Sequence, residues 1–166
     1  QIPLRSAIET ENAARIDELL IPLAINDALR EVLDLPQDMR DGAMNMMATS
    51  LAAELIEEAP AEVAALLMEG MDAEHAAEVI DELDSDIQAD VIGEMESVAA
   101  DAVLAKMDAE DADDVRRLVE YDDETAGGLM TTDVVAVRGS LTAERALQEV
   151  RLRGREVEDF YTVFVV

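Results

Sequence analysis

Carboxylate side chains recur at a fixed spacing through the middle of this 166-residue chain. Two sets of acids each repeat every 12 residues, and the second set follows the first by four residues. Because positions four apart share one face of a helix, the two sets predict a double ladder of acids along one surface. The first set is Glu62, Glu74, Asp86 and Glu110, interrupted by Val98; the second is Glu54, Glu78, Asp90 and Asp114, interrupted by Leu66 and Ala102.

Such a surface supports two interpretations. Mg²⁺ prefers carboxylate oxygens and keeps several of its waters, so one or two acids per ion suffice to hold it. The alternative is a solvated acidic face, of the kind found in salt-adapted proteins, and the presence of one lysine against eleven arginines fits it. The residues by themselves leave both interpretations open.

The charge and the missing residue types exclude several functions. Forty acidic residues against twelve basic ones give a formal net charge of −28, which disfavours binding to nucleic acid. The absence of cysteine excludes thiol catalysis and thiolate metal sites, and one histidine cannot build a multi-histidine site. There is no phosphate-binding glycine loop and no nucleophile elbow, so we do not expect an enzyme.

The single histidine, His75, occupies a repeat position that is apolar in other repeats, for example Leu51 and Ile87. This predicts a partly buried helix residue. A role as a ligand or as a pH switch is the alternative.

Apolar residues repeat with the same period of 12 and predict the architecture. Within each unit they lie at i, i+1 and i+4, which marks one face of a helix. A helix of about two turns is marginal alone but buries its apolar face when stacked on its neighbours, so we expect a mainly α superhelical solenoid. The three columns are Ala43, Leu55, Leu67, Val79, Val91, Val103 and Val115; Met44, Ile56, Met68, Ile80, Ile92, Leu104 and Arg116; and Met47, Ala59, Met71, Leu83, Met95, Met107 and Val119.

The boundaries between units carry residues that commonly begin helices. Asp72, Asp84, Ser97 and Asp108 are N-cap types, and Pro60 suits a first-turn position. Before the regular repeats, residues 11–20 and 24–33 read as amphipathic helices at the capping end of the solenoid. The repeat frame is expected to slip across residues 34–38.

The pattern changes after about Tyr121. Residues 126–128 break the helical periodicity, residues 133–137 and 160–166 are strand-like, and Ser140 or Thr142 can cap a helix that runs to about Arg153. The sequence therefore predicts a helical domain at 1–125 and a truncated βαβ fragment at 126–166. Its final residue lies within a strand pattern, so we expect a piece of a longer protein.

No apolar run approaches the ~20 residues needed to span a bilayer, and the first residues lack the apolar core of a signal peptide. The fragment is therefore expected to be soluble and cytoplasmic.

The acidic short-helix repeats, followed by Tyr-Asp-Asp-Glu-Thr-Ala-Gly-Gly-Leu-Met-Thr-Thr at 121–132, resemble the MgtE magnesium transporters. Residues 135–144 and 160–166 are similar to the start of the first CBS module of that family. The repeats alone are less specific, because the flagellar motor-switch protein has similar short helices. An acidic solenoid that serves as a protein-interaction scaffold is therefore the alternative.

The resemblance implies a Mg²⁺-sensing N domain plus a truncated first CBS domain. In that family the cytosolic region lies on the cytoplasmic side of the membrane, forms a homodimer in the full-length protein and connects to a transmembrane pore domain. Mg²⁺, or another divalent cation, docks the N and CBS domains and gates the pore. Alignment of the repeats with the family implies Glu62, Asp86 and Asp90 as the metal-binding residues.

Overall fold

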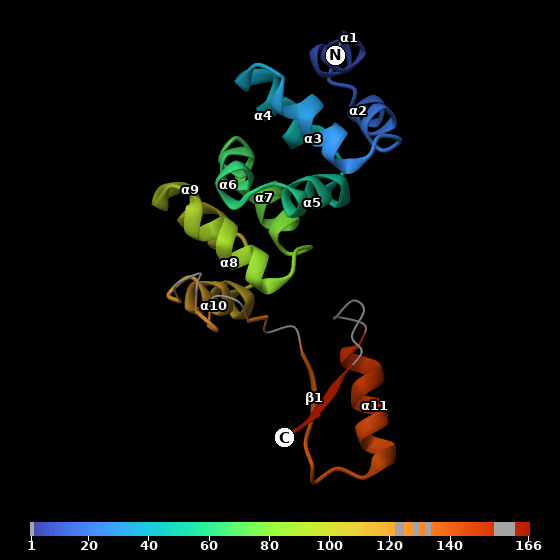
Figure 1. The fold of residues 1–166 in the computed structure, drawn as a ribbon, viewed down its shortest axis with the longest axis vertical. Coiled ribbons are helices and arrows are strands. Elements are labelled where there is room, and N and C mark those ends of the chain that lie inside the picture. Colours follow the sequence, from blue (N-terminus) through green and yellow to red (C-terminus); the bar gives the residue numbers. More distant parts are fainter. Residues whose placement is uncertain (1, 122–124, 128–129, 132–133, 155–161) are drawn as a thin grey trace. The chain divides into compact units, whose positions relative to one another are not determined.

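The structure is a computed structural model that describes residues 2–121, 125–127, 130–131, 134–154 and 162–166. The chain divides into two compact units, residues 1–129 and residues 130–166. The first unit is helical, and Figure 1 shows its helices stacked in the order of the sequence. Its helices are α1 (Ile2–Glu9), α2 (Ala13–Leu20), α3 (Ile25–Leu33), α4 (Gln37–Met46), α5 (Thr49–Glu58), α6 (Ala61–Glu69), α7 (Ala73–Ile80), α8 (Ser85–Glu94), α9 (Ser97–Leu104) and α10 (Ala109–Leu118).

The 12-residue period holds from the second helix to the tenth. Helices α2 to α10 begin at residues 13, 25, 37, 49, 61, 73, 85, 97 and 109, without a break. The expected slip across residues 34–38 is therefore wrong, since α4 begins in register at Gln37. Pro36 and Pro60 are the N-cap residues of α4 and α6, so Pro60 lies one position before the expected first turn.

From α5 onward each helix packs chiefly on helices two places away along the chain, whereas α1 packs on α2 and α4. Helices α3, α5, α7 and α9 form one stack, which we call the odd stack, and α2, α4, α6, α8 and α10 form the even stack. Consecutive helices therefore alternate between two layers, and the nearest equivalent neighbour lies 24 residues away in sequence. This solenoid confirms the predicted fold class.

The three apolar columns form the core between the two stacks. Every member of the first column is buried, from Ala43 to Val115. The exceptions in the other two columns are the half-buried Ala59 and the last members, Arg116 and Val119, which are exposed. Arg116 lies in α10 and Val119 is its C-cap residue, and no further repeat follows α10 among the described residues to cover them.

Backbone groups at helix starts are bound by side chains from distant repeats. The N–H of Asp72, the N-cap of α7, donates to Asn45 Oδ1 at 2.7 Å, and the N–H of Glu96, the N-cap of α9, donates to Glu69 Oε1 at 2.6 Å. Both pairs are 27 residues apart. Asp72, Asp84 and Asp108 are N-caps as expected, although none makes a side-chain cap hydrogen bond, whereas Ser97 is the first residue of α9.

The second unit contains β1 (Val135–Val137), α11 (Ala143–Arg153) and β2 (Val163–Val165). The two strands pair in parallel, with Val135 opposite Val163. Thr142, one of the two predicted cap residues, is the N-cap of α11, and its hydroxyl accepts from the Arg145 N–H at 3.4 Å. All of β2 is exposed. The predicted strand residues 133, 160 and 161 and the predicted break at 128 lie outside the described residues.

Candidate metal-binding surface

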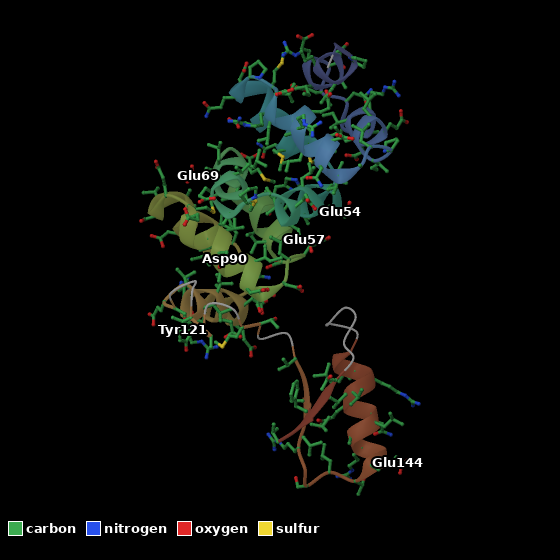
Figure 2. All side chains as sticks on the ribbon, viewed as in Figure 1. Glu54, Glu57, Glu69, Asp90, Tyr121 and Glu144 are labelled. Atoms are coloured by element: carbon green, nitrogen blue, oxygen red, sulfur yellow. The ribbon has the colours of Figure 1, made fainter. Side chains whose placement is uncertain are left out.

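Helices α6 and α8 carry the three acids that the family resemblance implies as metal-binding residues. Glu62 lies in the first turn of α6, Asp86 lies in the first turn of α8, and Asp90 follows one turn later. Because α6 and α8 are direct neighbours in the even stack, the structure brings these residues onto adjacent helices although 24 residues separate Glu62 from Asp86. Asp90 projects from α8 in Figure 2.

The expectation that the acids form one double ladder along a single surface is wrong. Since consecutive helices alternate between the stacks, Glu74 and Glu78 on α7 belong to the odd stack, whereas Asp86 and Asp90 on α8 belong to the even stack. The acids therefore form two half-ladders, each with one helix that interrupts it. In the even stack α6 has the exposed Leu66 in place of an acid, and in the odd stack α9 has the exposed Val98.

The helix dipole of α8 stabilises the carboxylate of Asp86 more than that of Asp90. A carboxylate in a first helical turn interacts favourably with the unpaired N–H groups there. Glu62 and Asp86 have this placement, whereas Asp90 lies one turn further along α8 and shares its face with Asp86. Two like charges at i and i+4 oppose helix formation by about 0.2–0.5 kcal/mol. A cation beside this pair would offset the repulsion.

The described residues do not form a complete metal site. Among the residues that the structure describes, no group of three or more histidine, cysteine, aspartate or glutamate side chains is placed to hold a metal ion. Mg²⁺ commonly keeps several waters and binds one or two carboxylates. An Mg²⁺ ion at this surface would take at most two ligands from the described residues, with water or another part of the protein supplying the rest.

A second acidic cluster was not found by sequence reasoning. Asp81 is the C-cap residue of α7, and burial raises its pKa above the ordinary value of 3.8, as do the charges of Asp111 and Asp108 to a smaller degree. Asp81 and Asp108 are separated by the same 27 residues as the pairs Asn45–Asp72 and Glu69–Glu96. A search of the sequence for polar residues 27 positions apart could therefore have predicted this cluster.

His75 is a partly buried helix residue, as its repeat position predicts. Its side chain is 19% exposed, and Nδ1 lies 3.4 Å from Glu78 Oε2 within α7. Glu74 on the same helix lies 3.9 Å from Nζ of Lys106, the one lysine of the chain. The Lys106 contact partly neutralises the acidic face of α7.

Together, the stacked 12-residue helices and the surplus of exposed carboxylates define an acidic α-solenoid domain, which is followed in sequence by a small α/β unit. The family described as the MgtE intracellular N domain matches residues 23–124, which is more than half of the chain. The chain therefore belongs to the MgtE family. The matched family is a regulatory domain of transporters and is not an enzyme family.

Similarity to individual proteins agrees with this assignment. The magnesium transporter MgtE of Thermus thermophilus is 40% identical over 52 residues, which are 31% of this chain and 12% of that protein. A solved structure of the cytosolic domain of the Mg²⁺ channel MgtE in complex with ATP has a TM-score of 0.80 and 26% identity over 99% of this chain and 68% of its own.

A solved structure of the soluble part of a magnesium transporter is 21% identical, with a TM-score of 0.71 over 98% of this chain and 64% of its own, and it shows likeness of fold. The chain is thus homologous to the cytosolic domain of a membrane transporter. Among its described helices, none combines the length and the apolar character that a membrane span requires.

Proposed function

We propose that this chain is the cytosolic Mg²⁺-sensing region of an MgtE-like magnesium transporter. Glu62, Asp86 and Asp90 contribute carboxylates to ions that lie between the helical domain and a CBS domain. The proposal extends to a full-length homodimer at the cytoplasmic side of the membrane, in which docking of these domains gates a transmembrane pore.

The placement of the three acids on two adjacent helices is the observation that carries this proposal. Asp86 and Asp90 lie one turn apart on α8, and Glu62 lies on the neighbouring α6. With a formal charge of −28, the chain can meet another acidic surface at low free energy only if cations lie between them. Family membership over residues 23–124 and the relatives' transport of magnesium support the identity of the ion.

The mechanism requires only that Mg²⁺ binds the docked arrangement of the domains more tightly than the undocked one. Without Mg²⁺, two acidic surfaces repel each other. With Mg²⁺ between them, each carboxylate gains an attractive contact only in the docked arrangement, so the ion shifts the population towards that arrangement. Because water fills most of the coordination shell, the affinity is modest and the response follows the cellular concentration of the free ion.

The test on this chain is a thermal melt in MgCl₂ and in NaCl at matched ionic strength. An ion that binds the folded state stabilises it beyond simple screening. We expect a larger rise in Tm with MgCl₂, and we expect Asp86→Asn combined with Asp90→Asn to remove most of the excess. The matched control is Glu74→Gln with Glu78→Gln, an equivalent pair on α7 in the odd stack, which should retain it.

The decisive experiment uses the complete cytosolic region. Small-angle scattering should show a more compact particle in Mg²⁺ than in matched NaCl, and the α8 variant should not compact. If Mg²⁺ causes no compaction, the sensor proposal fails and the acidic interaction scaffold becomes the better interpretation.

A further inference from the structure

The turn between α2 and α3 exposes four consecutive apolar residues at positions 21–24. Ile21 is 64% exposed and Leu23 is 41% exposed. Exposure of an apolar run of this length to water is unfavourable, and such runs commonly mark interaction sites. The exposure is more unusual here because 31% of the chain is charged.

The repeat register shows that Leu23 is a core position without a covering neighbour. It precedes Leu35 and Met47 by 12 and 24 residues in the third apolar column. Those two residues and most later members of that column are buried, whereas Leu23 is not. The first repeat therefore presents to solvent a side chain that its successors bury.

Ile21 departs from the register in a different way. The equivalent positions in α4 and α6 are Asn45 and Glu69, which accept backbone N–H groups of later helix starts. In the first repeat the equivalent hydrogen bond is made by Asp17, one turn before Ile21. Its Oδ1 accepts from the Ala48 N–H at 3.1 Å. Position 21 therefore has no capping task and carries an apolar side chain that points to solvent.

These residues border a cavity of about 220 Å³, which we call the N-terminal groove. Ile25 and Leu51 contribute apolar walls, and Ser50 and Glu54 contribute polar groups from α5. No basic side chain lines the groove. Glu57 extends the acidic side of α5, and Figure 2 shows both Glu54 and Glu57 on this helix.

We propose that the N-terminal groove binds a basic amphipathic segment of a protein partner. An aliphatic side chain of that segment enters between Leu23 and Leu51, and its lysine or arginine side chains lie over Glu54 and Glu57. Charge complementarity selects this occupant, because Glu54 lines the groove, Glu57 lies on the same helix and no basic side chain is among the lining residues. This interaction is independent of the metal-binding surface, which lies on α6 and α8.

The experiment measures binding of a synthetic amphipathic leucine–lysine peptide to the 166-residue chain by fluorescence anisotropy. The matched peptide has glutamate at every lysine position. Ile21→Ser combined with Leu23→Ser should weaken binding by about tenfold or more, because two aliphatic contacts are lost. Glu54→Gln should weaken it by about two- to fivefold at low salt and have less effect at high salt.

The control variants are Val98→Ser, an exposed apolar residue on α9, and Glu144→Gln, an exposed acid on α11. Both should bind the peptide like the parent chain. Far-UV circular dichroism should show unchanged helicity for every variant. If the double serine variant loses helicity, Ile21→Ser alone is the replacement, because Ile21 is largely exposed. Amide chemical shifts should move for residues 20–25 and 48–54.

Several results would overturn the proposal. Equal binding of both peptides, no binding of the leucine–lysine peptide, or equal loss of binding in Glu54→Gln and Glu144→Gln would show that the groove does not select the ligand. Binding to phosphatidylcholine vesicles that the serine variant abolishes would assign the apolar turn to a membrane surface. Concentration-dependent dimerisation abolished by the same variant would assign it to a second copy.

Discussion

The side-chain amide of Asn45 joins three segments of the solenoid through its donor and acceptor groups. Its Oδ1 accepts from the Asp72 N–H at 2.7 Å, while Nδ2 donates to the Gly70 carbonyl at 3.0 Å and to the Asp41 carbonyl at 2.9 Å. Asn45 thus holds α4 against the loop between α6 and α7. The bonds to Gly70 and Asp72 connect residues two repeats apart, so they specify which helices stack.

Asn45→Ala should destabilise the chain by about 1–3 kcal/mol, because it leaves backbone groups at Asp72 and Gly70 without their partners. The measurement is the free energy of unfolding from urea denaturation. Asn26→Ala, at an exposed position of α3, is the matched control and should change stability by less than about 0.5 kcal/mol. Equal effects of the two changes would mean that the Asn45 contacts contribute little.

The glycine in the same loop has no space for a side chain. A Cβ at Gly70 would lie 2.6 Å from Cγ of Asp41, so the carboxylate would have to move. Gly70→Ala should destabilise by about 1–3 kcal/mol, as overpacking does. The second change Asp41→Ala should recover part of that loss, which a double-mutant cycle measures.

Gly93 provides the matched control for that substitution. A Cβ there would meet only Val119 Cγ1 at 3.8 Å, an ordinary contact, and Gly93 lies in the last turn of α8. Gly93→Ala should stabilise by about 0.4–1 kcal/mol, because alanine restricts the unfolded chain and favours the helix. Destabilisation at both glycines would contradict the difference in space.

The neighbouring residues Leu66 and Leu67 test the core arrangement directly. Leu67 is fully buried in the first apolar column, whereas Leu66 is 44% exposed. Leu67→Ala should cost about 2–5 kcal/mol of unfolding free energy, and Leu66→Ala should cost much less. Similar losses at both positions would be inconsistent with the helical face assigned to α6.

Asp81→Asn tests the acidic cluster through pH. Since burial and the neighbouring Asp111 and Asp108 raise the pKa of Asp81 in the folded state, the folded protein binds the proton more tightly than the unfolded chain does. Stability from this group is therefore present at pH values below the ordinary 3.8 and is lost as pH rises through the folded value. The ionised aspartate thus opposes folding at neutral pH.

We expect Asp81→Asn to raise the Tm modestly at pH 7, and we expect the gain to shrink as the pH falls through the raised folded pKa of Asp81 towards the ordinary value of 3.8. The effect should also weaken in high salt because the group is near the surface. Asp101→Asn, at an exposed position of α9, provides the control. A gain that is independent of pH would exclude titration of Asp81 as its cause.

The sequence alone determined the repeat unit and most of its core. A column such as Ala43 to Val115 must be buried wherever 12-residue helices stack, because each short helix can exclude water from its apolar face only against a neighbour. Local side-chain chemistry predicted a helix cap at Ser140 or Thr142 and the strand-like segments around β1 and β2; the structure places the cap at Thr142. Family resemblance, not the repeat itself, singled out Glu62, Asp86 and Asp90.

The tertiary structure decided which repeats touch. Stacking of alternate helices separated Glu74 and Glu78 from Asp86 and Asp90, although the two pairs are consecutive in the sequence pattern. The contacts that produce this arrangement, such as Asn45 with Asp72 across 27 residues, depend on helix packing and leave no local signature. Leu35 is buried and Leu23 is exposed although both occupy the same repeat position. Helix packing decides this difference too, because the position is buried only where a further helix covers it.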